Sequence, residues 1–326
     1  MREDRYRAIV EARARRPEAI AEAAAARRQP DSLLDRDGRL LVVAADHPAR
    51  GALRAGRRPL AMADRAELLD RLCLALSRPG VGGVLATADV LEDLLLLGAL
   101  DGKVVIGSMN RGGLAGTVFE VDDRFTAYDA AAIAAAGLQG GKMLLRIDPD
   151  DPATAATVEA CGRAVAALAR RDLLALVEPF IVHRVDGRLR PELTTEAMIH
   201  AVTVAAGLGT TSARTWLKVP VVDQMERVMA ATTLPALLLG GEVGDAREAA
   251  FAGWRKALAL PTVHGLVVGR ALLYPPDDDV AAVVDAAVAL LHRGSGGLKS
   301  EAGTQAAGGH LEPSGSPPVN QEEAAL

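Results

Sequence analysis

The chain has 326 residues, of which 50% are hydrophobic, 24% are charged and 3% are aromatic, and its formal net charge is −5. This apolar fraction can bury a large core and excludes global disorder, while the acidic balance and the scarcity of aromatic residues argue against a nucleic-acid partner. The apolar runs, such as that at 94–97, are too short to cross a bilayer, and the charged first residues are not followed by the apolar segment of a signal peptide. We therefore expect a cytoplasmic protein without a membrane partner, and the composition leaves open a homo-oligomer.

The two ends of the chain differ in composition from its centre. Residues 1–28 are rich in Ala, Arg and Glu, which predicts one or two helices within an N-terminal helical extension at 1–37. Residues 295–326 are rich in Gly, Ser, Pro and Glu and have no periodic apolar positions, which predicts a disordered tail. The region 38–294 is therefore the expected globular domain.

Within 38–294, short apolar runs alternate with amphipathic segments. The runs are nearly continuous in Val, Leu, Ile and Ala, as in strands that are covered on both faces. The expected strands are 40–46, 83–88, 103–108, 142–148, 173–181, 215–222, 236–241 and 265–271. The expected helices are 62–77, 90–99, 128–137, 154–171, 194–207, 224–231, 245–259 and 278–292. This order predicts an α/β protein with a single (β/α)8 barrel, the TIM barrel. A doubly wound sheet is the alternative, but no G-x-G-x-x-G motif follows the first strand.

A lysine stands inside the apolar run at 215–222, which reads Thr-Trp-Leu-Lys-Val-Pro-Val-Val with Lys218 in fourth place. Lysine is rare in this chain, in which five lysines stand among 37 basic residues. Burial favours the neutral amine, which is the form that attacks a carbonyl group, and arginine cannot take this role. Lys218 is therefore a candidate nucleophile, and a structural lysine held in a salt bridge is the alternative.

Two acids stand in or after expected strands. Glu178 follows five apolar residues, so we expect a raised pKa and a role in proton transfer, with an ion pair to a buried base as the alternative. Asp46 ends the first strand and is placed to accept a proton or orient a lysine, although it is equally suited to cap a turn. A divalent-metal site of His47, Glu178 and His183 is a further alternative, but no second histidine stands at metal-ligand spacing from His47.

The run at 142–148 places several polar side chains on one face, because they are separated by even numbers of residues. The outer face of a barrel strand packs on helices, so we expect the polar face to point into the barrel; a layered salt bridge is the alternative. The long Gly-rich loop at 110–126 is expected to cover the same end of the barrel. The candidate substrate-binding residues are Lys142, Arg146, Asp148, His47, Arg50, Asn110 and Arg111.

Glycines accompany the last two strands. Gly240 and Gly241 follow one strand, and Gly269 precedes Arg270 in the other. Glycines after the last two strands of a barrel let backbone N–H groups approach an anion, and an arginine adds a charge-assisted clamp. We therefore expect a phosphate site there; tight turns would explain the glycines but not Arg270.

Together these residues match the needs of a Schiff-base aldolase that acts on a phosphorylated ketose. Lys218 would attack the ketone, and the resulting iminium would draw electrons from the carbon–carbon bond that breaks. Glu178 or Asp46 would take up the hydroxyl proton and later protonate the enamine.

The motifs resemble the class I tagatose-1,6-bisphosphate aldolase family and its relative that cleaves 2-deoxy-5-keto-gluconate 6-phosphate in myo-inositol breakdown. The resemblance covers about 38–292 and is carried by AADHPARGAL, KMLLRIDPDDP, ALVEPFIV, TWLKVPVV, LLLGGE and GLVVGRALLYP. It implies that Lys218 forms the Schiff base and that Glu178 transfers protons. The other site residues that it implies are Asp46 and Lys142, which line the site, and Gly269 and Arg270, which hold phosphate.

The resemblance also implies the reaction. A phosphorylated keto sugar or keto sugar acid would be cleaved to a triose phosphate and an aldehyde, with inositol breakdown as the setting and with neither a metal nor an organic cofactor. The chain departs from the family where Gln-Arg-Gly is replaced by His-Pro-Ala-Arg-Gly at 47–51, and where Arg-Ile-Asp at 146–148 replaces aromatic residues. Both places bear on the substrate rather than on the Schiff base.

Three other functions remain as alternatives. Deoxyribose-phosphate aldolases share the barrel and a lysine on the sixth strand, but their Lys-Thr-Ser-Thr-Gly stretch is absent here. A divalent-metal barrel lyase would use the histidines named above. A non-catalytic barrel that binds phosphosugars would keep the site without turnover.

Overall fold

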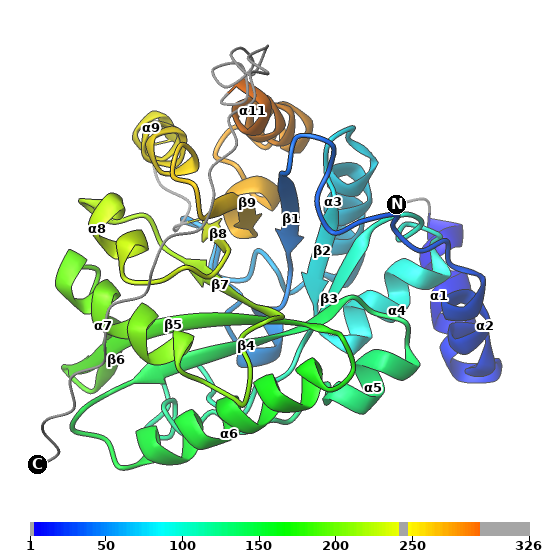
Figure 1. Ribbon diagram of the computed structural model, residues 1–326. Helices are drawn as coiled ribbons and strands as arrows, with labels where there is room; N and C mark the ends of the chain where they lie inside the picture. The colour runs from blue at the N-terminus through cyan, green and yellow to red at the C-terminus, as the bar shows by residue number, and fades with distance from the viewer. Residues whose placement is uncertain (1–2, 241–246, 294–326) are drawn as a thin grey trace, which may run out of the picture. The chain divides into compact units, whose positions relative to one another are not determined.

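Eight parallel strands close into a barrel in the computed structural model, which describes residues 3–240 and 247–293 (Figure 1). The barrel strands are β1 (Leu40–Ala44), β2 (Gly83–Ala86), β3 (Val104–Ser108), β4 (Gly140–Ile147), β5 (Leu174–Val185), β7 (Thr215–Val219), β8 (Ala236–Leu239) and β9 (Val263–Val268). Neighbouring strands follow the order β4-β3-β2-β1-β9-β8-β7-β5, and parallel pairing between β4 and β5 closes the ring. This confirms the predicted TIM barrel and excludes the open doubly wound sheet.

Helices cover the outside of the barrel (Figure 1). They are α3 (Arg65–Ser77), α4 (Ala88–Leu96), α5 (Ala130–Ala135), α6 (Ala153–Ala169), α7 (Thr195–Ala206), α8 (Met225–Ala230), α9 (Arg247–Leu258) and α11 (Val280–Arg293), with the short α10 (Arg270–Leu273) after β9. Several begin where the sequence offers a capping side chain: Asp64 accepts from the Glu67 N–H group, and Asp129 accepts from that of Ala132. No helix in the described ranges is long and apolar enough to cross a membrane.

Two helices precede the barrel, as the composition of 1–28 predicts. They are α1 (Glu3–Arg15) and α2 (Glu18–Ala26). Arg13 of α1 pairs with Asp93 and Glu92 of α4 at 2.8 and 3.0 Å, which ties the extension to the outside of the barrel. The tail expected at 295–326 lies outside the described residues.

The barrel interior is apolar at one end and polar at the other. The inner apolar cluster consists of Leu40, Val42, Ala44, Leu85, Val104, Ile106, Leu174, Leu176, Leu237 and Val267, with Leu33, Leu34 and Trp216 packed against it. Alternate side chains of the same strands point outward into the larger core beneath the helices. Further along the strands, the inward positions of β4, β5 and β7 carry charged residues, so the functional groups gather at the carboxyl ends.

Several strand ends differ from the predictions, and two of these differences bear on the site. β5 runs on to Val185 and pairs with an antiparallel strand, β6 (Arg188–Pro191), which the sequence reading omitted. The turn residues Asp186 and Gly187 both have positive φ, at 48° and 73°, as a two-residue type I′ hairpin requires. β9 ends at Val268, so Arg270 begins α10 rather than standing within a strand.

Candidate functional site

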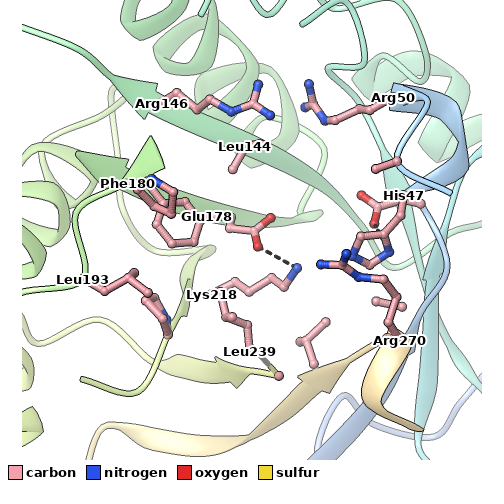
Figure 2. A pocket seen from close by; sticks show the side chains of 18 of the residues that line it. His47, Arg50, Leu144, Arg146, Glu178, Phe180, Leu193, Lys218, Leu239 and Arg270 are labelled. Carbon is pink, nitrogen blue, oxygen red and sulfur yellow. Dashed lines mark ion pairs between the residues drawn. The ribbon is translucent and has the colours of Figure 1, made fainter. Parts of the chain in front are cut away.

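The centre of the site is a buried cluster of charges at the carboxyl ends of β1, β4, β5 and β7. The Glu178 carboxylate lies between two ammonium groups. Its Oε1 atom is 2.8 Å from Lys218 Nζ (Figure 2), and its Oε2 atom forms an ion pair with Lys142 Nζ. Lys142 Nζ is also 3.3 Å from Asp46 Oδ2, which Arg111 Nη2 approaches to 3.1 Å. All five residues are buried. The barrel thus brings together Lys218, Glu178 and Asp46, which the sequence predicted as catalytic, and Lys142. We call these five residues the charge cluster.

The charge cluster changes the pKa values of its own members. Burial alone would raise the pKa of Glu178, but its attraction to Lys142 and Lys218 is stronger and lowers the pKa to about 2. Burial also opposes ionisation of Asp46, yet Arg111 and Lys142 hold its pKa well below the usual range. For Lys142, burial outweighs the neighbouring carboxylates and lowers the pKa to about 8. The raised pKa expected for Glu178 is therefore wrong, because two ammonium groups fold against it.

His47 lies beside the charge cluster as a neutral imidazole. Its Nδ1 atom is 3.9 Å from Asp46 Oδ1 and is buried without a hydrogen-bond partner. The ring packs against Gly269, where an added Cβ would lie 2.8 Å from His47 Cε1. Burial lowers the pKa of His47 to about 3, so at neutral pH the ring offers one donor and one acceptor.

Two arginines hold the loop that follows β3 against the site. Arg50 donates to loop carbonyl oxygens at 2.8 and 2.6 Å and pairs with Asp123. Arg146 pairs with Glu120 at 3.0 Å and lies 3.6 Å from the same Asp123. Figure 2 shows both guanidinium groups at one edge of the pocket. We call Arg50, Arg146, Glu120 and Asp123 the arginine clamp; its two positive and two negative charges cancel.

These side chains line a cavity of about 670 Å³. Its volume is typical of a small-molecule site, and it opens at the face where (β/α)8 barrels carry their active sites. The predicted site residues that line it are Asp46, His47, Arg50, Arg111, Lys142, Arg146, Glu178, Lys218, Gly240, Gly269 and Arg270.

Among the described residues, two other predicted site residues do not line this cavity. Asn110 is buried, and its amide accepts from Leu144 N at 2.8 Å and donates to Leu144 O at 2.6 Å, so it joins the loop to β4. Asp148 follows the last residue of β4 and lines a separate depression with Asp150 and His183, which corrects its predicted place inside the barrel. Gly241 lies outside the described residues.

The predicted metal-site alternative does not assemble. His183 stands beyond the barrel on β5, where its Nε2 atom is 3.0 Å from Glu192 Oε2, and it does not line the cavity that holds His47 and Glu178. Within 3–240 and 247–293, the group at metal-ligand spacing is Asp148, Asp150 and His183.

The predicted phosphate glycines have a packing role as well. A Cβ at Gly240 would lie 2.5 Å from Val268 Cγ1, and one at Gly269 would lie 2.5 Å from the Ala44 carbonyl oxygen. These close approaches explain why neither position carries a side chain. Arg270 lines the same side of the cavity, and its Nη1 atom donates to the Arg54 carbonyl oxygen at 3.4 Å.

Sequence reasoning missed two parts of the site. The acids Glu120 and Asp123 have no motif spacing to their arginine partners, so only the fold reveals the arginine clamp. The second part is a group of apolar side chains on and after the β5–β6 hairpin, and the Asp-Gly turn at 186–187 is the signal that could have found it. We call this group the apolar wall; it consists of Phe180, Val182, Leu189, Pro191 and Leu193.

The fold and the site define a TIM barrel with a charged small-molecule cavity at its carboxyl face. Known aldolase structures share this barrel. A Schiff-base-forming fructose-1,6-bisphosphate aldolase has a TM-score of 0.59 and 19% identity, over 80% of this chain and 97% of that chain. A fructose-bisphosphate aldolase from Slackia heliotrinireducens has a TM-score of 0.61 and 16% identity, over 78% and 81%. At these identities the likeness concerns the fold.

The chain belongs to the Cgl0159-like family, which matches residues 38–288. The crystal structure of Cgl0159 from Corynebacterium glutamicum is 51% identical, with a TM-score of 0.88 over 90% of this chain and 98% of that chain. The comparison with curated proteins gives no match. The expected relation to class I aldolases therefore holds at the level of the barrel, and the tagatose and inositol branches stay predictions.

Proposed function

We propose that the protein is a class I aldolase in which Lys218 forms a Schiff base with a phosphorylated keto sugar or keto sugar acid. The observation that carries the proposal is the placement of one buried carboxylate, Glu178, between Lys218 and Lys142 at the carboxyl ends of the strands. Barrels of the same fold include an archaeal fructose 1,6-bisphosphate aldolase with its catalytic lysine bound to a carbinolamine intermediate, which supports this chemistry.

In the proposed reaction, Glu178 serves as the base and then as the acid. The Lys218 ammonium group passes a proton to Glu178, and the resulting amine attacks the ketone carbon to form a carbinolamine. Glu178 then returns this proton to the carbinolamine hydroxyl, which leaves as water and gives an iminium. Glu178 takes the proton of the hydroxyl two carbons away, the carbon–carbon bond breaks, and its electron pair moves toward the iminium nitrogen to give an enamine and an aldehyde. Glu178 returns its proton to the enamine carbon, and water then releases the triose phosphate from Lys218.

Lys142 serves a different role from Lys218 in this proposal. Its Nζ atom contacts both Asp46 and Glu178, and with a pKa of about 8 it is mainly protonated at neutral pH. The Lys142 ammonium group therefore holds the two carboxylates in place and favours the ionised form of Glu178. Lys218 contacts Glu178 from the opposite side and is the proposed nucleophile.

The charge of the site suits a phosphate. The charge cluster holds three cationic side chains and two carboxylates, which leaves one net positive charge, and Arg270 lies on the same cavity. We place the phosphate beside Gly269 and Arg270, as the resemblance implies, and beside Gly240, as the glycine pattern predicts. The products would be a triose phosphate and an aldehyde, and inositol breakdown remains the proposed setting.

Borohydride trapping tests this function. The protein is incubated with dihydroxyacetone phosphate and reduced with borohydride, and the modified peptide is identified by mass spectrometry. We expect one triose-phosphate adduct, on Lys218. Lys218→Arg keeps the positive charge beside Glu178 but cannot form a Schiff base, so its adduct should be absent. Lys103→Arg is the matched control, because Lys103 donates to the Val81 carbonyl oxygen outside the cavity.

The other outcomes assign the alternatives. An adduct on Lys142 would move the nucleophile to β4. Phosphosugar binding without any adduct would refute the aldolase and favour the non-catalytic barrel. Activity that is lost on chelation, again without an adduct, would favour a metal-dependent lyase.

A further inference from the structure

The apolar wall occupies the side of the cavity away from Arg270. Figure 2 shows Phe180 and Leu193 on one side, Arg270 on the other, and the reacting pair Lys218 and Glu178 between them. Val182 is buried, and Leu189 and Pro191 reach the cavity from β6, where they pair with Arg184 and Val182 across the hairpin. Phe180 lies where β5 still pairs with β4, and the rest of the wall comes from the hairpin and the residues after it, which extend beyond the eight-stranded barrel.

The position of the wall along β5 relates it to one part of the substrate. Every second residue of β5 points to the inner face, and Glu178, Phe180 and Val182 all line the cavity. Residues two positions apart on a strand lie roughly 7 Å from each other along it. In the proposed reaction Glu178 takes the proton of the hydroxyl on the carbon that becomes the aldehyde. The substrate carbons that follow this aldehyde carbon would therefore contact Phe180 first and Val182 next.

The wall offers little to a hydroxyl group. Its side chains carry no hydrogen-bonding atom, and Trp254, which also lines the cavity, already donates its Nε1 hydrogen to the Leu239 carbonyl oxygen at 3.3 Å. The neighbouring arginine clamp has no net charge, and its acids and loop carbonyls accept from both guanidinium groups. A hydroxyl placed on the wall would lose hydrogen bonds to water without replacing them.

We propose that the aldehyde half of the substrate is deoxygenated, with methylene or methyl carbons packed on the apolar wall. This inference rests on the proposed aldolase function and narrows its substrate class. The phosphate-bearing half lies on the charged side of the cavity, and the other half is read by hydrophobic contact rather than by hydrogen bonds.

Aldol addition with dihydroxyacetone phosphate as the donor tests this inference. The acceptors are matched pairs of equal carbon number, propanal against glyceraldehyde and butanal against erythrose, followed by pentanal. We expect kcat/KM to favour the deoxygenated member of each pair by roughly 10-fold or more, since each unpaired hydroxyl is costly. From propanal to pentanal, kcat/KM should rise roughly four-fold per methylene.

A variant separates the wall from the intrinsic reactivity of the aldehydes. Leu189→Ser places a hydroxyl on the wall and should flatten the chain-length series to less than about two-fold per methylene. Leu114→Ser is the control, because Leu114 is an exposed leucine that does not line the cavity. The dependence of kcat/KM on aldehyde chain length should be the same in this variant as in the unchanged protein.

The outcomes distinguish failure of this inference from failure of the proposed aldolase function. A dihydroxyacetone-phosphate adduct on Lys218 together with a preference for glyceraldehyde or erythrose would overturn the inference and leave the aldolase standing. A chain-length series that Leu189→Ser does not change would also overturn it. Absence of the adduct would refute both.

Discussion

Replacing Glu178 with Gln removes the carboxylate that two lysines share. The charge cluster then holds three cations and one carboxylate, so its net charge rises from one to two, and Lys218 loses its partner at 2.8 Å. Breaking a buried ion pair by removing one member costs roughly 3–5 kcal/mol, because the other charge stays buried. We expect Glu178→Gln to lower the free energy of unfolding at pH 7 by about 3 kcal/mol.

A second substitution in the same chain should reverse part of this loss. Lys218→Met removes the uncompensated ammonium and returns the net charge of the charge cluster to one. We therefore expect the double variant Glu178→Gln/Lys218→Met to be more stable than Glu178→Gln alone by at least about 1 kcal/mol, although it carries one substitution more.

Equilibrium unfolding in urea, followed by circular dichroism, measures both changes, and an unchanged slope with urea shows that the variants unfold in the same way. The control is Glu159→Gln, whose carboxylate pairs with Arg163 on an exposed face of α6, and its midpoint should not move. A Glu178→Gln variant within about 1 kcal/mol of the unchanged protein would refute the reasoning. So would a double variant that is less stable than the single one.

Three further predictions concern pH, the loop after β3 and two glycines. The folded pKa of Glu178, about 2, lies below the unfolded value of roughly 4.3, so its stabilisation is complete above the unfolded value and is lost as the pH falls toward 2. The stability difference between the unchanged protein and Glu178→Gln should therefore narrow over this range in urea titrations, and a constant difference would contradict the low pKa. Asp123→Asn should speed proteolytic cleavage within 110–124 relative to Asp122→Asn, because Asp123 is buried between both arginines of the clamp; equal rates would show that the clamp does not hold the loop. In thermal unfolding, Gly265→Ala should be strongly destabilising, because its Cβ would overlap a β1 carbonyl oxygen, whereas Gly162→Ala should stabilise α6 by about 0.5–1 kcal/mol, because the nearest atom is 3.8 Å away. Shifts of Tm in the same direction would refute this contrast.

The sequence by itself determined the barrel. Runs of apolar residues alternate with amphipathic segments in an order that predicts eight strand–helix units, and each predicted strand overlaps an observed one. Period-two alternation also placed Lys142 and Arg146 on the inner face of β4, where both line the cavity. These features are local, because the backbone geometry that sets them repeats every two residues in a strand and about every 3.6 residues in a helix.

Period-two alternation predicts which side chains share a face, but it does not predict where a strand ends. Asp148 continues the alternation of β4 by sequence, but the strand ends at Ile147 and the side chain leaves the barrel. The β5–β6 hairpin carries its own local signal in Asp186 and Gly187, so it was open to prediction from the sequence.

Only the tertiary structure determined the ion-pair partners of the charged site residues and the pKa of Glu178. An apolar run around Glu178 predicts a raised pKa, yet the closed barrel brings Lys142 and Lys218 against its carboxylate from two other strands and lowers the pKa to about 2. In the same way Asp123 reaches Arg50 and Arg146 only once the loop after β3 folds over the strand ends. Electrostatic attraction depends on distances between residues far apart in the chain, and those distances exist only when the ring of strands has closed.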